Sequence, residues 1–325
     1  MKVLVRLPNW LGDAVMATPV LESLKASYPT ALFTLVGTPV ALSLFEGDER
    51  VERLVVDESK KAKSRLFWLY KAAKELGSFD IAITLQNSLL SALFLFFTGS
   101  KVRIGYAREF RSLFLTHAPK ENKKIHQVLR YLELVKPFCT TVTEKLHISS
   151  NATPKNLCII NPGAAYGEAK RWEAVKFGEV ATRLSKEYDI AIVGAPNEVD
   201  IGAQVEETLK THGVTNYQNL VGKTTMRELV DLIASAKLFI TNDSGPMHIA
   251  AAFCVPTVAI FGSTDENETA AWGNPHYAVV KKDMDCRPCK KRTCPLKHHD
   301  CMRLIGAAEV LEAVKRLEES AALCG

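Results

Sequence analysis

The sequence lacks an apolar run long enough to cross a membrane as a helix. Its most apolar stretch, Leu89–Phe97, is under half of the roughly 20 residues that such a helix requires. It also lacks a recognisable signal peptide, because Arg6, Pro8 and Gly12 interrupt the apolar region that export would need. We therefore expect a cytoplasmic protein without a transmembrane anchor.

Little in the composition favours a disulfide scaffold or a disordered tail. Eight cysteines are present, but without an export signal they are expected to remain reduced thiols. Apolar residues make up 47% and charged residues 24% of the 325, and neither kind is gathered into a long low-complexity segment. This length favours two domains of about 150 residues each over one oversized core.

The positive charge is concentrated in the first half of the chain. Residues 1–150 hold 21 Lys+Arg and 14 Asp+Glu, whereas residues 151–325 hold 20 and 22. Within the first half, residues 101–150 alone hold 10 basic and 4 acidic side chains. A local excess of this kind indicates an anionic partner, an anionic membrane surface or simply a solvated basic face.

Two series of alternating strands and helices are predicted, separated by a polar stretch at residues 147–156. Nearly continuous apolar strands with helices between them predict parallel sheets that are covered on both faces. The predicted strands are Val3–Leu7, Leu32–Gly37, Leu54–Val56, Ile81–Leu85, Val102–Gly105, Leu157–Asn161, Ile190–Gly194, Leu238–Asn242 and Thr257–Phe261.

The segments between the strands have the apolar spacing of helices that pack on a sheet. The predicted helices include Ala14–Ala26, Val175–Lys186, Met226–Ser235 and Ala307–Ala322. We therefore predict an α/β fold with two Rossmann-like, doubly wound domains, residues 1–152 and residues 153–325.

The turn after the first predicted strand is the first candidate site. It reads PNWLGD, ends at Gly12 and Asp13, and lies at the carboxyl end of a strand, where such folds bind ligands. Gly12 permits close backbone approach, and the charge of Asp13 is favoured near a helix N-terminus. Asp13 therefore either caps this helix or takes part in chemistry. The turn is not a GxGxxG loop, which argues against a dinucleotide-dependent dehydrogenase.

A loop in the second half has the features of a phosphate site. After a predicted strand, Gly163, Ala164 and Ala165 offer backbone N–H groups, and Lys170 follows with a positive charge. An ordinary surface loop with solvated basic residues would look the same. Glu198 follows another strand and could accept a hydrogen bond from a ribose or an adenine.

The turn TNDSGPMH, which contains Asp243, Ser244, Gly245 and His248, is the most informative motif. Ser244 can cap a helix, the following proline suits its first turn, and Gly245 lets a ligand approach closely. The helix N-terminus would then be open to phosphate. Alternatively, Asp243 and Ser244 only cap the helix and His248 belongs to the core.

Four cysteines fall within 16 residues near the end of the chain: Cys286, Cys289, Cys294 and Cys301. Thiolates at this density could bind zinc in a closed structural site. However, the gaps between them differ from those of paired CxxC knuckles, and reduced thiols in a packed loop are the alternative.

Together these motifs resemble a known family. The segments RLPNWLGDAVMATP, RIGYAREFRSLFLT, NPGAAYGEAKRW, TNDSGPMHIAAA and CRPCKKRTCPLKHHDCM are similar, in this order, to bacterial lipopolysaccharide heptosyltransferases of glycosyltransferase family nine. The similarity extends from near the first residue to about Ile305 and is closest to the heptosyltransferase II group.

The resemblance implies a GT-B fold, in which two Rossmann-like domains face a cleft. It implies transfer of L-glycero-D-manno-heptose from ADP-heptose to the heptosylated Kdo-lipid A inner core, with inversion and without a catalytic metal. No cofactor is then required, and any zinc would be structural. The first domain would bind the acceptor and the second the ADP-sugar donor, in an enzyme associated peripherally with the cytoplasmic face of the inner membrane and without a nucleic-acid partner.

The resemblance also assigns residues. Asp13 would be the general base for the acceptor hydroxyl, with Gly12 beside it, and Lys170 would bind phosphate. The donor motif falls on Asp243, Ser244 and Gly245, followed by His248.

Two sets of residues would face the negative charges of the donor and of the acceptor. Ala164 and Ala165 replace the family's small hydroxyl residues, so backbone N–H groups must serve at that loop. The basic side chains that would face the anionic, lipid-linked acceptor are Lys101, Arg103, Arg108, Arg111, Lys123 and Lys124.

Three alternatives remain open from the sequence. One is heptosyltransferase I, and a second is another GT-B nucleotide-sugar enzyme with a different donor, including an epimerase. The third is a zinc-stabilised nucleic-acid-binding protein, although the basic residues are not interleaved with the aromatic residues that would stack on bases.

Overall fold

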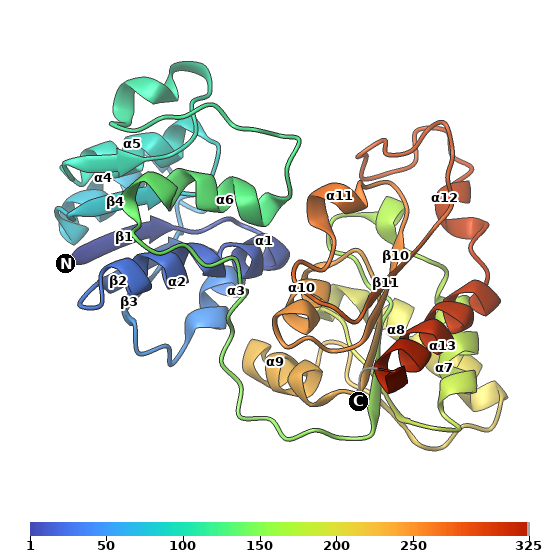
Figure 1. Cartoon of the computed structure of the whole chain (residues 1–325). Coiled ribbons are helices and arrows are strands. Elements are labelled where there is room, and N and C mark those ends of the chain that lie inside the picture. The colour runs from blue at the N-terminus through green and yellow to red at the C-terminus, as the bar shows by residue number, and fades with distance from the viewer. Residues whose placement is uncertain (324–325) are drawn as a thin grey trace. The chain divides into compact units, whose positions relative to one another are not determined.

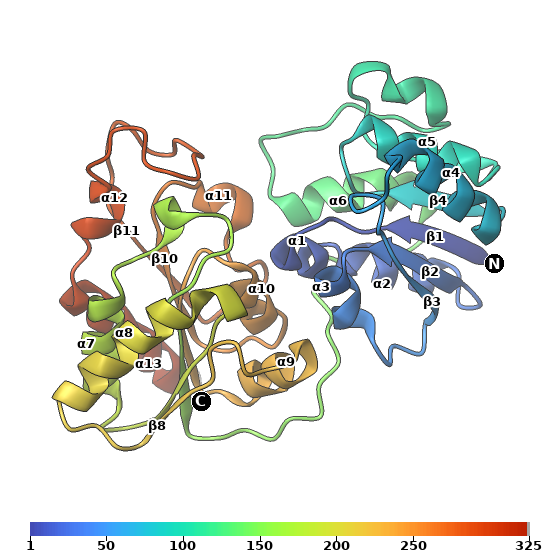
Figure 2. The same cartoon turned by 180° about the vertical axis from the view of Figure 1, so that it is seen from behind.

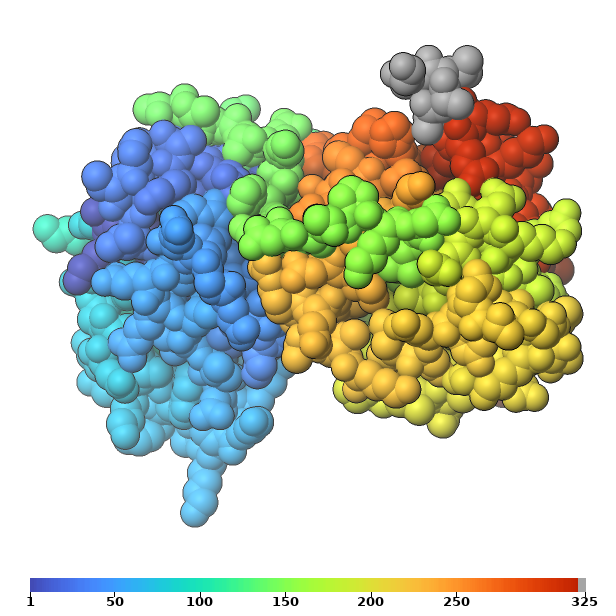
Figure 3. Space-filling model, turned by 90° about the horizontal axis from the view of Figure 1, so that it is seen from below, coloured from blue at the N-terminus to red at the C-terminus, as the bar shows by residue number. Residues whose placement is uncertain are grey.

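The computed structural model describes residues 1–323 (Figure 1). The chain divides into two compact units, Met1–Ser149 and the residues from Ser150 onward. The extended segment around residue 150 lies on the surface and is green in Figures 1 and 3. The predicted boundary after residue 152 lies in this segment, three residues beyond the observed division.

The first unit is a parallel sheet with helices on both faces, in the strand order β3-β2-β1-β4-β5. Its strands are β1 Lys2–Arg6, β2 Leu32–Gly37, β3 Val51–Val56, β4 Ile81–Thr84 and β5 Val102–Ile104. Its helices are α1 Leu11–Met16, α2 Thr18–Ser27, α3 Pro39–Leu42, α4 Arg65–Leu76, α5 Leu89–Phe97 and α6 Gln127–Val135, with the 3-10 turns η1 Ser43–Phe45, η2 Glu109–Phe114 and η3 Lys136–Phe138.

Apolar side chains of α4 and α5 cover one face of this sheet. Leu69 of α4 and Phe94 of α5 are fully buried in a cluster with Leu4 of β1 and Ala82 of β4. Helices α2 and α6 pack together on the other face, and Figures 1 and 2 show the two layers from opposite sides. The alternation of strand and helix in the sequence thus produces a sheet shielded from water on both faces.

The second unit repeats this architecture in the strand order β11-β10-β9-β6-β7-β8, again with parallel pairs throughout. Its strands are β6 Leu157–Asn161, β7 Asp189–Ile192, β8 Tyr217–Asn219, β9 Leu238–Asn242, β10 Thr257–Phe261 and β11 Tyr277–Lys281. Its helices are α7 Ala174–Leu184, α8 Val199–Thr211, α9 Met226–Ser235, α10 Gly245–Ala252, α11 Glu266–Thr269, α12 Asp300–Arg303 and α13 Ala307–Leu323, with the 3-10 turns η4 Glu168–Lys170 and η5 Pro196–Glu198.

Helices α7, α8 and α13 bury their apolar faces on one side of the second sheet. Phe177, Val205 and Val314 come from these three helices and join one core cluster with the strand residues Ile160 and Ile240. The predicted α/β fold with two doubly wound units is therefore confirmed. Within residues 1–323, every helix is too short or too polar to cross a bilayer.

The predicted helix Ala14–Ala26 is wrong in one respect, because the structure divides it into α1 and α2 at Ala17. Pro19 has no N–H to donate to the carbonyl of Val15, so the helical ladder breaks there. The Thr18 hydroxyl donates to that carbonyl instead, at 2.8 Å.

Strands β8 and β11 were not among the predicted strands. Both lie at the edges of the second sheet, and within them only Val280 is buried. An edge strand needs no continuous apolar run, so the sequence pattern there is weak.

Candidate functional site

The strongest candidate site lies at the carboxyl ends of β6 and β9 in the second unit. These two strands are neighbours, and the chain leaves them toward opposite edges of the sheet. Such a reversal opens a crevice at the strand ends, which is where doubly wound folds bind ligands. The loop after β6 carries Gly163, and the turn after β9 carries Asp243 and Ser244.

Two buried asparagines tie this loop and this turn together. Asn161 Nδ2 donates to Thr241 Oγ1 and to Ser244 Oγ, both at 2.8 Å. Asn242 Nδ2 donates to the Pro162 carbonyl at 2.8 Å, and its Oδ1 accepts from the Trp172 N–H at 3.0 Å. Because each amide is nearly out of contact with water, these bonds hold the backbone of the site in one arrangement.

The N-terminus of α10 lies at the centre of the site. Ser244 occupies the cap position with an extended backbone, but its side chain makes no cap bond because Asn161 and Thr241 engage it. Pro246 takes its place in the first turn, where a missing N–H costs nothing. The N-terminal N–H groups therefore lack a side-chain cap and present partial positive charge to an anion.

Lys170 lies beside this helix end, held by Asp243. Its ammonium is 2.6 Å from Asp243 Oδ2, and Thr264 Oγ1 donates to the same oxygen at 2.6 Å. The side chains of Lys170 and Asp243 are only 12% and 3% exposed. The lysine also lies 4.8 Å from the centre of the Tyr166 ring. Asp243 therefore fixes the ammonium near the positive end of α10, a geometry suited to phosphate oxygens.

Glu198 is brought against the same loop. It is 5% exposed, and its Oε2 accepts from the Ala195 N–H at 2.8 Å. Its Oε1 is buried and has no hydrogen-bond partner within the described part of the chain. A Cβ atom on Gly163 would lie 2.1 Å from Oε2, so this glycine makes room for the carboxylate. A buried oxygen without a donor is costly, and a ligand hydroxyl would satisfy it.

The other predicted residues of this site differ in how deeply they are buried. Gly245 is the first residue of α10, while His248 is 3% exposed and faces the interior. Ala164 is buried and Ala165 is exposed. Thr264 was not predicted, because a threonine after a strand carries no signal until the fold places it beside Asp243.

In the first unit, Asp13 lies in α1 just after β1. Its Oδ1 accepts a hydrogen bond from the Tyr131 hydroxyl at 3.1 Å. Burial, together with the charge of Asp13, raises the pKa of Tyr131 well above its ordinary value. Tyr131 therefore stays protonated and keeps donating to this carboxylate. Gly12, which directly precedes Asp13, is buried. Tyr131 could not be predicted, since 118 residues separate it from Asp13.

The six predicted basic residues differ in their availability. Lys101, Arg108, Lys123 and Lys124 are exposed. Arg103 is partly buried, and its Nη1 and Nε donate to the carbonyls of Ser100 and Phe114, at 2.6 and 2.8 Å.

Arg111 is a buried cation. It is 1% exposed, and its guanidinium donates to Asn87 Oδ1 at 3.1 Å and to Ser91 Oγ at 3.4 Å. Its Nε has no hydrogen-bond partner within residues 1–323, and the charge of Glu121 favours its charged form only in part against burial. Burial lowers the pKa of Arg111 to about 10, with Arg108 contributing, so it is still charged at neutral pH. A buried charge that is only partly compensated favours an anionic ligand.

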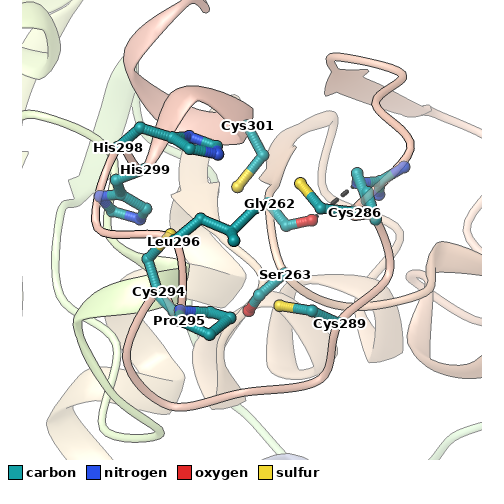
Figure 4. Close-up of a pocket in the computed structure, with 12 residues that line it drawn as sticks. Gly262, Ser263, Cys286, Cys289, Cys294, Pro295, Leu296, His298, His299 and Cys301 are labelled. Carbon is teal, nitrogen blue, oxygen red and sulfur yellow. Dashed lines mark hydrogen bonds between the residues drawn. The ribbon is translucent and has the colours of Figure 1, made fainter.

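The four clustered cysteines line one pocket of the second unit (Figure 4). Leu296 points into it, and His298 and His299 also line it. Burial raises the pKa of the Cys301 thiol, with the three other cysteines adding to the effect. In the described residues, no three His, Cys, Asp or Glu side chains are grouped as a metal site requires. Zinc binding by these cysteines therefore stays a prediction.

Comparisons with known proteins agree on one family. Residues 69–299 match the model described as glycosyltransferase family 9 (heptosyltransferase). Lipooligosaccharide heptosyltransferase 2 of Campylobacter jejuni subsp. jejuni serotype O:6 is 34% identical, over 98% of this chain and 99% of that protein. Lipopolysaccharide heptosyltransferase 2 of Escherichia coli is 28% identical, over 83% and 85%. The structure of ADP-heptose lps heptosyltransferase II of E. coli matches with a TM-score of 0.80 and 25% identity, over 99% and 100%.

Proposed function

Because the chain belongs to glycosyltransferase family 9, the heptosyltransferases, we propose that it transfers heptose from ADP-heptose to the inner core of lipopolysaccharide. The sugar is L-glycero-D-manno-heptose, and the acceptor is Kdo-lipid A that already carries one heptose. The observation that carries this proposal is the Lys170–Asp243 pair beside the uncapped N-terminus of α10. The names of the relatives, heptosyltransferase 2, support the choice of acceptor.

The second unit binds the donor. The diphosphate of ADP-heptose accepts from the N–H groups at the start of α10 and from Lys170, while backbone N–H groups at Gly163 and Ala164 replace side-chain hydroxyls. Glu198 accepts from a ribose hydroxyl. The N–H groups and Lys170 stabilise the negative charge that develops on the diphosphate as its bond to the sugar breaks.

The first unit supplies the base. Asp13 takes the proton from an acceptor hydroxyl as that oxygen bonds to the anomeric carbon, and the bond from this carbon to the diphosphate oxygen breaks with release of ADP. The displacement inverts the anomeric centre. It requires no metal ion, because the helix end and the lysine provide the positive charge.

The acceptor and the membrane are both anionic, which suits the basic first unit. Arg111 binds an acceptor carboxylate or phosphate, helped by the exposed Arg108, Lys123 and Lys124. Since the acceptor is lipid-linked, the enzyme works as a peripheral protein at the cytoplasmic face of the inner membrane.

The decisive experiment is transfer from ADP-heptose to purified Kdo-lipid A, with and without the first heptose, in the presence of a chelator. We expect chelator-resistant transfer only to the heptosylated acceptor. Transfer to the acceptor without heptose would indicate heptosyltransferase I, and transfer to neither would exclude this donor or acceptor.

Isotope exchange at the second carbon of a nucleotide sugar, without acceptor, would indicate an epimerase. Metal analysis of the same sample tests for zinc at the cysteines.

Replacing Gly163 by alanine tests the position of Glu198. Because the new Cβ would overlap the Glu198 carboxylate, we expect the side chain to be displaced and ADP binding to weaken about tenfold. Isothermal titration calorimetry with ADP measures the change. Gly306→Ala is the matched control, since its Cβ would meet nothing closer than 3.8 Å. Unchanged ADP affinity in Gly163→Ala would remove Glu198 from the donor site.

Replacing Tyr131 by phenylalanine tests the orientation of Asp13. The carboxylate loses one hydrogen bond, so we expect kcat to fall about tenfold while the KM for ADP-heptose stays unchanged. Tyr106→Phe is the control, because its hydroxyl bonds the Arg130 carbonyl and not Asp13. An equal loss in both variants would mean that Tyr131 only stabilises the fold.

A further inference from the structure

The most exposed large apolar side chains of the described residues lie on one 3-10 turn of the first unit. Phe110 and Leu113 of η2 are 77% and 76% exposed. Such extensive contact with water is unfavourable for both side chains. A second exposed apolar patch lies on the neighbouring helices, so these two residues are not isolated exposed side chains of the kind that any surface has. That patch consists of Phe67 and Tyr70 of α4 and Phe96 of α5, which are 66%, 45% and 46% exposed.

These side chains come from neighbouring elements, because α5 packs against both α4 and η2. Aromatic rings connect the three elements. The Tyr70 ring lies 5.3 Å from that of Phe97, and Phe96 lies 6.1 Å from Phe97 and 5.5 Å from Phe114. We call Phe67, Tyr70, Phe96, Phe110 and Leu113 the α4–α5–η2 surface. Figures 1 and 2 show α4 and α5 beside each other in both views.

The turn that carries Phe110 and Leu113 is held in place by hydrogen bonds on its buried side. Arg111, between them in sequence, is buried and bonds Asn87 and Ser91, so its two apolar neighbours are directed outward. Arg103 fixes the end of the turn by donating to the Phe114 carbonyl. The two side chains therefore project from a held turn and not from a free loop.

The chain segment that carries this surface is positively charged. Between residues 58 and 124 there are 13 Lys+Arg and 5 Asp+Glu, a balance of +8. Two of these cations lie directly at its rings, since the Arg103 guanidinium is 5.6 Å from the centre of the Phe96 ring and the Lys74 ammonium 5.8 Å from that of Tyr70. Rings flanked by cations suit the boundary between acyl chains and anionic headgroups.

We infer that the α4–α5–η2 surface is the face by which this protein adsorbs to an anionic lipid bilayer, with Phe110 and Leu113 entering the headgroup region. The charge selects this occupant, because a second copy would bring the same +8 against itself, whereas anionic lipid attracts it. The inference gives the proposed membrane enzyme a specific surface, and it can be tested without any transfer reaction.

The test is flotation of the full chain with phosphatidylglycerol-containing vesicles and with vesicles of phosphatidylcholine alone. We expect binding only to the former, reduced by added salt, and a loss of about tenfold or more in the double variant Phe110→Ser/Leu113→Ser. The control is Val175→Ser/Leu304→Ser, which removes side chains that are 53% and 58% exposed in the second unit. This control should float as the unchanged protein does.

Three outcomes would overturn the inference. The double variant could float as well as the unchanged protein, or binding could be independent of lipid charge and salt. Sedimentation could instead show self-association that the double variant abolishes, without vesicle binding, which would make this face a contact between copies. Transfer to a deacylated, water-soluble acceptor separates the two proposals: its absence in the unchanged protein defeats the proposed function alone, and it should be normal in the double variant.

Discussion

Asp13→Asn should lower kcat for heptose transfer by about a thousandfold, because the amide cannot take the proton of the acceptor hydroxyl. Asparagine keeps the shape of the side chain and an oxygen for the Tyr131 hydroxyl, so the fold of α1 should persist. Affinity for ADP-heptose should stay within about twofold, since the proposed base acts in the transition state and the proposed donor residues belong to the second unit. Single-turnover kinetics and donor titration measure the two quantities separately.

The matched control for this variant is Asp283→Asn, which removes a carboxylate whose side chain is 88% exposed. It should transfer heptose at the unchanged rate. If Asp13→Asn instead loses donor affinity and keeps its turnover, Asp13 is a donor-binding residue or a helix cap, and the base must be sought elsewhere.

Lys170→Ala should weaken ADP binding by about 10- to 100-fold and lower kcat as well, because in the proposed reaction the ammonium binds the diphosphate and also stabilises it as the leaving group. It should also lower the melting temperature. Asp243 is 3% exposed, and without the lysine its carboxylate is a buried charge that has lost its cation. Lys210→Ala is the control, since that lysine is 58% exposed and pairs with Glu206 one turn earlier on α8.

A second variant separates binding from stability. In Lys170→Ala/Asp243→Asn, the buried charge is gone, so the melting temperature should recover much of its loss. ADP affinity should remain low, because no cation has been restored. Recovery of ADP affinity along with stability would mean that Lys170 serves the fold, and that the helix N-terminus binds the diphosphate by itself.

The sequence predicted most of the fold correctly for a simple reason. Strands that are buried on both faces must be nearly continuous in apolar residues, and β2, β6, β9 and β10 begin and end where that pattern does. The errors fall where burial is partial or where one residue changes the backbone. The edge strand β11 has little buried surface, and Pro19 divides a helix that apolar spacing alone would continue.

In the candidate site, too, the sequence predicted some residues and missed others. Lys170, Asp243 and Ser244 stand in recognisable motifs, and the structure brings them together at the carboxyl ends of β6 and β9. Arg103 also stands in a motif, yet its Nε and Nη1 bond to backbone carbonyls. The partners Thr264 and Tyr131 carry no motif, because a single hydroxyl gains a role only from what the fold places beside it.

The sequence by itself determined the two parallel sheets, the helices that cover them and the turns at the strand ends, because these follow from apolar periodicity and local backbone preference. Only the tertiary structure decided that Lys170 is paired with Asp243, that Glu198 lies against Gly163, and that Arg111 is buried. Burial, hydrogen-bond partners and the ionisation they control are set by neighbours distant in the chain. Spacing along the sequence carries no information about which of those neighbours will meet.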